Sequence, residues 1–279
     1  MNPTQCLHRP HHLRGLRPTA LLAAVLASLT LPAAHAQTTP AATPATNTVD
    51  LIATHSSISA GLPDGQALNL RLTSLRGGDD VLRAELLSER RFGATGGVIG
   101  AGFSHGLSAD WFMGANLTLG HGGPNWPRQR LDLSLSTRLG AQRDTIAQVS
   151  AYRALYDNQR SDRGLGLALI SYAFSPLVLQ AGVTANVSDP GAVNSAMTTL
   201  SGTWGQEGQQ YISLRLSSGT ESYQALGAGQ QLVDFKSHSV ALNWRRWLGP
   251  RWGLSAQAEH YRNPSYERLS VSAGVFSQW

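Results

Sequence analysis

One serine–histidine pair in the sequence has the spacing of a hydrolase motif. Residues 102–106 read Gly-Phe-Ser-His-Gly and match the G-x-S-x-G pattern of serine hydrolases. That motif requires a strand, a sharp turn and a helix, whereas here a tight turn and a second strand pattern follow. Adjacent residues on a strand point to opposite faces, so Ser104 and His105 cannot act together as nucleophile and base. We therefore predict no catalytic residue in this motif.

The other candidate residues for catalysis or metal binding are isolated. None of the histidines after residue 50 has the paired spacing of a metal site; they are His55, His105, His121, His238 and His260. The single cysteine, Cys6, lies in a segment that we expect to be removed, which excludes thiol chemistry and disulfides. We predict a non-enzymatic protein without metal or cofactor. The alternative is a lipid-modifying hydrolase that uses Ser104 or a histidine.

Several apolar segments carry one or two charged residues among the polar residues that alternate with their leucines. They share the face opposite the leucines, and the candidates for lining an interior are Arg71, Arg83, Glu85, Asp132, Arg138, Arg215, Arg245 and Glu259. One interpretation is a paired network that fills a narrow barrel. The other is a pore whose excess of arginine favours anions.

The segment that best defines the surrounding element is the last one, 269–279. Leu269, Val271, Ala273 and Val275 alternate with small or polar residues, and the segment ends on Trp279. This period-two pattern predicts a strand with one apolar face, of the kind that closes outer-membrane barrels. About fourteen such segments follow one another along the chain, with 12–16 possible. We predict an all-β fold, a single antiparallel transmembrane β-barrel.

The predicted connections differ at the two ends of the strands. Those after even-numbered strands are short, whereas several after odd-numbered strands are longer or more polar, at 120–128, 157–163, 189–194 and 218–234. Outer-membrane barrels have short periplasmic turns and longer extracellular loops, so both termini are expected in the periplasm. Aromatic residues gather near the predicted strand ends, and those expected at the membrane interface are Trp111, Trp204, Tyr211, Trp247, Trp252 and Trp279.

The N-terminal region resembles a secretory signal. Residues 1–36 combine three arginines, the apolar run 20–31 and an Ala-His-Ala cleavage site at 34–36. Residues 37–48 form a Pro/Thr/Ala-rich lead-in, and the barrel is predicted over 49–279. Cleavage leaves 19 of the 22 Lys and Arg residues against 17 acids, a net charge of +2, and Lys236 is the one lysine. Scattered single arginines argue against a nucleic-acid partner.

From Glu85 to the end, the sequence resembles the YaiO-type outer-membrane β-barrel family. The resemblance rests on residues 85–91 (ELLSERR), 123–135 (GPNWPRQRLDLSL), 208–221 (GQQYISLRLSSGTE) and 237–253 (SHSVALNWRRWLGPRWG). It implies a single barrel in the outer membrane of a Gram-negative bacterium and no known enzymatic activity. Related barrels form the C-terminal parts of exopolysaccharide secretion proteins, behind helical repeats that this sequence lacks.

The sequence therefore predicts a narrow pore or an envelope component associated with surface polysaccharide. The partners expected are outer-membrane lipid and the barrel assembly machinery, which would engage the C-terminal strand. A soluble periplasmic β-sandwich remains an alternative, because alternation alone also fits a sheet with one solvated face.

Overall fold

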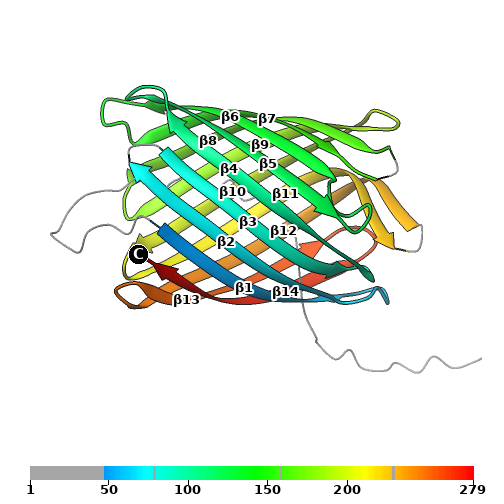
Figure 1. Ribbon diagram of the computed structural model, residues 1–279. Helices are drawn as coiled ribbons and strands as arrows, with labels where there is room; N and C mark the ends of the chain where they lie inside the picture. Colours follow the sequence, from blue (N-terminus) through cyan, green and yellow to red (C-terminus); the bar gives the residue numbers. More distant parts are fainter. Residues whose placement is uncertain (1–46, 78–79, 158, 228–229) are drawn as a thin grey trace, which may run out of the picture.

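The protein is a closed barrel of fourteen antiparallel strands, seen from the side in Figure 1. A computed structural model describes residues 47–77, 80–157, 159–227 and 230–279. The strands are β1 Asn47–Ile58, β2 Gly65–Gly77, β3 Asp80–Arg91, β4 Ala94–Gly106, β5 Trp111–His121, β6 Gln129–Leu139, β7 Thr145–Leu155, β8 Ser161–Phe174, β9 Leu177–Asp189, β10 Val193–Gln206, β11 Gln210–Gly227, β12 Gln230–Gly249, β13 Trp252–Arg262 and β14 Glu267–Gln278.

Each strand pairs with its neighbours in sequence, and β1 pairs with β14 to close the ring. The seam is continuous, with Thr48 opposite Gln278 and Ile58 opposite Arg268. At its end the backbone N–H of Asn47 donates to the carbonyl of Trp279 at 3.0 Å. The predicted antiparallel barrel is confirmed, and the alternative of a two-sheet sandwich is wrong because a single sheet closes on itself.

The alternation in the sequence becomes an outer and an inner face. Leucines point outward around the ring and stay exposed, as Leu133 (47%) and Leu179 (40%) do. The inner face carries small polar residues at many of the alternate positions, including the buried Ser136, Ser217 and Ser270. An apolar exterior with a polar interior is the pattern of a barrel surrounded by hydrocarbon. In the described residues no helix is long and apolar enough to cross a bilayer.

We call the two openings of the barrel the terminal end, where Asn47 and Trp279 lie, and the loop end, which is opposite (Figure 1). Connections at the loop end include 59–64, 122–128 and 156–160, whereas those at the terminal end include 175–176 and 250–251. The first strand begins at Asn47, two residues before the predicted start of the barrel. Residues 1–46, with the predicted signal and almost all of the lead-in, lie outside the described residues.

The expectation of a loop at 218–234 is wrong. Its described residues continue β11 and β12 as a hairpin, with Thr220 opposite Lys236 and Ala225 opposite Gln231. The sequence there is rich in Ser, Gly, Thr and Gln, which suggested a loop. A hairpin that extends beyond the hydrocarbon needs no apolar face, because water can solvate both of its sides.

Candidate functional site in the barrel lumen

The eight charged residues singled out in the sequence lie on the inner face of the barrel. Each alternates with outward residues of its strand, as Arg83 and Glu85 do with the exposed Leu82 and Leu86. They are distributed around the wall, on β2, β3, β6, β11, β12 and β13. Only Arg71 and Glu85 pair with each other, at 3.1 Å between Arg71 Nε and Glu85 Oε1. Their side chains are 42% and 41% exposed, so water reaches the wall at mid-height.

Three more charges of this set, Asp132, Arg245 and Glu259, form ion pairs with residues that the sequence analysis did not select. Asp132 binds Arg130 through two nitrogens, with an Nη2–Oδ1 distance of 2.6 Å. Arg245 pairs with Asp50 on β1. Glu259 pairs with Arg268 at 3.7 Å, and both side chains are only 4% exposed. Asp50 and Arg268 occupy inner positions of their strands, so the phase of the neighbouring apolar residues could have identified them.

Two inner arginines form no ion pair with a described residue. Arg83 lies between Thr73 and Gly102 in the cross-strand register, and Arg215 lies between Ser201 and Ala241. Arg138 differs, because its guanidinium donates to the carbonyl of Ala109 and stacks on the Phe112 ring at 5.1 Å. Since the remaining inner charges are largely paired, Arg83 and Arg215 give the lumen an excess of positive charge.

An apolar cluster lies inside the barrel at the loop end. Its buried members are Ile58, Phe92, Tyr261 and Tyr266, with Leu62, Leu226 and Leu232 packed against them. Phe92 meets Tyr266 edge-on, with ring centroids 5.5 Å apart. Burial raises the pKa of Tyr266, which lies in the β13–β14 connection, so its phenol stays neutral and suits an apolar contact. We call these seven residues the loop-end cluster.

The conformation of Phe92 is unusual for so large a residue. Phe92 and Gly93 form the two-residue turn between β3 and β4, with φ of 50° and 80°. Such turns normally carry Asn-Gly or Gly-Gly, because bulky residues avoid positive φ. The strain is on the order of 1 kcal/mol or more. It is offset by burial of the ring, which is 3% exposed, so the turn holds an aromatic ring in the mouth of the barrel.

A tryptophan from the β5–β6 connection is also buried inside the barrel at the loop end. Trp126 is 2% exposed, and its Nε1–H donates to Glu89 Oε2 at 3.1 Å on the inner face of β3. Gly96 permits this approach, because a Cβ there would lie 2.6 Å from the indole ring. Glu89 also binds Arg91 at 2.9 Å, so the indole is held by a buried ion pair. No periodicity marks Trp126 in the sequence, and reasoning from strand patterns could not have placed it.

The inner wall of β6 to β11 carries a connected polar network. Tyr152 donates its hydroxyl to Asn186 Oδ1 at 2.8 Å, and the Arg130 guanidinium lies 4.1 Å from the Tyr152 ring centroid. The Asn186 amide donates in turn to three serines, Ser188, Ser195 and Ser222. Hydroxyl, amide and guanidinium groups thus face the lumen together, which suits binding of polar solutes.

Near the terminal end, two of the six predicted interface aromatics point inward. The Trp247 indole is 9% exposed and donates to Gln278 Oε1 at 2.7 Å. Tyr211 packs edge-on against it at 5.4 Å. The prediction of a membrane-interface position is therefore wrong for these two residues. Their strands have Ile212 and Leu242 on the outer face, and period-two alternation then places Tyr211 and Trp247 inside.

The remaining predicted interface aromatics are half-exposed on the outer surface: Trp111, Trp204, Trp252 and Trp279, each between 46% and 52%. Inside the barrel, Phe276 packs with the inward aromatics of the terminal end. Its ring centroid lies 4.9 Å from that of Trp247 and 3.5 Å from the Arg245 guanidinium carbon. Gly253 makes room for it, since a Cβ there would lie 2.5 Å from the ring of Phe276.

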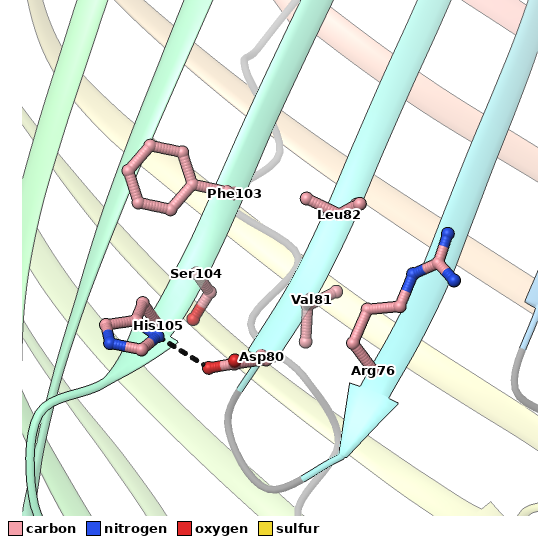
Figure 2. Close-up of a pocket in the computed structure, with 7 residues that line it drawn as sticks. All are labelled: Arg76, Asp80, Val81, Leu82, Phe103, Ser104 and His105. Carbon is pink, nitrogen blue, oxygen red and sulfur yellow. Dashed lines mark hydrogen bonds and ion pairs between the residues drawn. The ribbon is translucent and has the colours of Figure 1, made fainter.

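The G-x-S-x-G motif lies at the terminal end of β4, beside a rim pocket of about 350 Å³ (Figure 2). His105 is exposed on the outer face and its Nδ1 contacts Asp80 Oδ1 at 2.8 Å, whereas Ser104 is 6% exposed on the inner side of the strand. The pocket is also lined by Leu82 and Phe103. Ser104 and His105 therefore diverge, as strand geometry requires. Among the described residues no group of three His, Cys, Asp or Glu could hold a metal ion.

Comparison with known proteins gives the family. A family model described as the YaiO membrane beta barrel domain matches residues 46–224, more than half of the chain. The chain belongs to this family. The match begins before the region in which the sequence resemblance was recognised and ends within β11. A search of curated protein sequences finds no match.

Solved structures agree on the fold of this YaiO-family barrel. The CymD monoaromatic hydrocarbon channel is 7% identical, with a TM-score of 0.55, over 84% of this chain and 88% of that one. An outer membrane channel from Pseudomonas putida F1 is 11% identical, with a TM-score of 0.52, over 85% and 97%. A bacterial polysaccharide outer membrane secretin is 10% identical, with a TM-score of 0.51, over 84% and 98%. At such identities the likeness concerns the fold alone.

Proposed function

We propose that this outer-membrane barrel is a narrow channel that favours anions and is closed at rest by the loop-end cluster. The observation that carries the proposal is the inner wall, where Arg83 and Arg215 face a water-accessible lumen and form no ion pair with a described residue. Uncompensated positive charge in a confined pore raises the local concentration of anions. The channel-like neighbours share the fold of this barrel and are consistent with the proposal.

The test is ion selectivity in planar bilayers under a salt gradient. We expect the protein to conduct in brief openings with a reversal potential displaced toward that of chloride. The double substitution Arg83→Gln and Arg215→Gln should abolish most of that displacement, because it removes the two uncompensated charges. Arg90→Gln is the matched control, because Arg90 lies on the same strand as Arg83 but on the lipid side. If neither the native protein nor the Phe92→Asn variant conducts ions, the channel is refuted.

We infer a second candidate, an envelope role linked to surface polysaccharide, from the polar network on the inner wall. The Tyr152 and Asn186 pair offers a hydroxyl and an amide beside Arg130, which suits an acidic sugar. Blockage of conductance by short acidic oligosaccharides, weakened in Asn186→Ala, would support it, and equal blockage of both proteins would count against it.

We also propose that the protein is not an enzyme. In the described structure, Ser104 and His105 point to opposite sides of the wall and His105 is engaged by Asp80. Overexpression should therefore leave the composition of envelope lipids unchanged in mass spectrometry. New lyso- or acylated lipids that disappear in Ser104→Ala or His105→Ala would favour the hydrolase instead.

A further inference from the structure

Two arginines on the outer surface of the barrel lie directly opposite each other. Arg153 on β7 and Arg163 on β8 are cross-strand partners. Both are exposed, and each shares its face of the strand with an outward leucine two residues away, Leu155 and Leu165. Their side chains therefore leave the wall on its lipid side, near the loop end of the strands.

The surroundings of this arginine pair are apolar. In the same cross-strand row, Leu131 flanks Arg153 and Val187 flanks Arg163. Leu165, one step closer to the middle of the barrel, is 66% exposed and lies between Ala151 and Ala185. The two guanidinium groups thus sit at the outer edge of the surface that contacts hydrocarbon, where long side chains can extend toward the headgroups.

No carboxylate among the described residues compensates these charges. Asp189, the acid on the adjacent strand, is in register with Ser161 and forms no ion pair with Arg163. Elsewhere on the same rim Arg262 has such a partner, Glu267, at 3.3 Å. Like charges directly opposite each other destabilise a strand pair, and the cost grows at a lipid-facing surface. An external anion would remove that cost.

We propose that Arg153 and Arg163 bind the phosphate group of an acylated glycolipid in the outer leaflet of the membrane. Guanidinium groups bind phosphate oxygens with paired, charge-assisted hydrogen bonds, and two facing arginines can share one phosphate. The loop end carries the longer connections and therefore faces the cell exterior. The apolar surface around Leu165 favours a phosphate that carries acyl chains over free phosphate, because the chains bury this surface.

The experiment is native mass spectrometry of the full-length protein in detergent, titrated with lipid A, a phosphorylated and acylated glucosamine disaccharide. The double substitution Arg153→Gln and Arg163→Gln should lower the affinity for lipid A about tenfold or more. The matched control Arg90→Gln removes a single outward arginine from the same rim and should change the affinity by less than about twofold. Equal affinity of the double variant and the native protein would overturn the proposal, as would an equal loss in Arg90→Gln.

Three further probes identify the source of the phosphate. Phosphatidylethanolamine should bind more weakly than lipid A, and inorganic phosphate should not compete with it at millimolar concentration. Phosphatidylglycerol that binds as well as lipid A would overturn the assignment to a glycolipid, and competition by inorganic phosphate would overturn the assignment to a lipid.

A stability measurement keeps the test independent of affinity. Without anionic lipid the double variant should resist heat at least as well as the native barrel in gel-mobility assays, because the facing charges are gone. With lipid A the native protein should gain more stability than the variant does. Equal gains for both proteins would contradict a site at this pair. The test does not depend on ion conduction, so the channel can fail while this site stands.

Discussion

Aromatic side chains gather inside the lumen at both of its ends, but the chain holds these side chains in different ways. At the terminal end Trp247 and Phe276 project from β12 and β14, so the strand register fixes both rings. At the loop end Tyr261 projects from β13, but Phe92, Trp126 and Tyr266 come from connections between strands. Strand positions are fixed by the hydrogen-bonded ladder, whereas connections can rearrange without opening it. We expect residues fixed on strands, at either end, to govern stability, and the loop-end connections to govern conduction.

The largest effect is expected at the buried ion pair Glu259–Arg268. Glu259→Ala leaves the Arg268 guanidinium, 4% exposed, without its carboxylate and should cost about 3–5 kcal/mol of unfolding free energy. Glu85→Ala is the matched control, since it breaks a half-exposed pair and should cost about 1 kcal/mol or less. Urea denaturation in lipid vesicles measures both values. Similar costs for Glu259→Ala and Glu85→Ala would show that burial does not increase the contribution of the Glu259–Arg268 pair to stability.

Removal of the terminal-end ring should come next. Phe276→Ala deletes a side chain that is 2% exposed and packs on Trp247, with an expected cost of about 3 kcal/mol. Phe174→Ala, at a ring that is 60% exposed, should cost much less. The same denaturation assay applies. If Phe276→Ala instead increased conductance without loss of stability, the roles assigned to the two ends would be reversed.

The loop end is tested by Phe92→Asn. Asn-Gly is the preferred sequence for a turn with positive φ at both positions, so relief of strain offsets part of the lost packing. We expect a net loss of stability of about 2 kcal/mol, together with longer openings in single-channel recordings. Phe103→Asn, on the lipid side of β4, should not lengthen the openings. Unchanged openings in Phe92→Asn would remove Phe92 from the gate.

The smallest effect compares two tryptophans. Trp247→Phe loses the hydrogen bond to Gln278 inside the lumen and should cost about 1 kcal/mol. Trp111→Phe keeps an aromatic ring at the lipid interface and should cost less than about 0.5 kcal/mol. Thermal shifts of the folded band on gels would resolve the order, and a larger shift for Trp111→Phe would contradict the inward placement of Trp247.

The strands and their facing could be predicted because leucine marks the hydrocarbon side wherever it recurs. β6 shows this best, with Leu131, Leu133 and Leu135 outside and Asp132 inside. The signal failed in β7, whose phase could not be fixed from the sequence. There the alanines Ala147 and Ala151 lie on the outer face with Val149, while the larger Ile146 is buried inside.

The aromatic residues that point into the lumen could be predicted only where they lie on strands. Tyr211 and Trp247 lie near strand ends, which favours the membrane interface, but the strand phase set by Ile212 and Leu242 already indicates the lumen. Phe92, Trp126 and Tyr266 are different, because a turn or loop imposes no period that could reveal which residue folds inward. Ion pairs such as Arg245–Asp50 join strands that are distant in sequence, and only the closed ring brings them together.

The seam between β1 and β14 joins residues that are up to 232 positions apart. β14, the fourteenth strand along the sequence, therefore completes the ring, and any sheet that lacks it presents two unpaired edges. Bare backbone amides are excluded from hydrocarbon, so such a half-built sheet has no stable place in the bilayer. Loss of the final strand should consequently leave an uninserted polypeptide for envelope proteases to degrade, instead of a smaller cylinder.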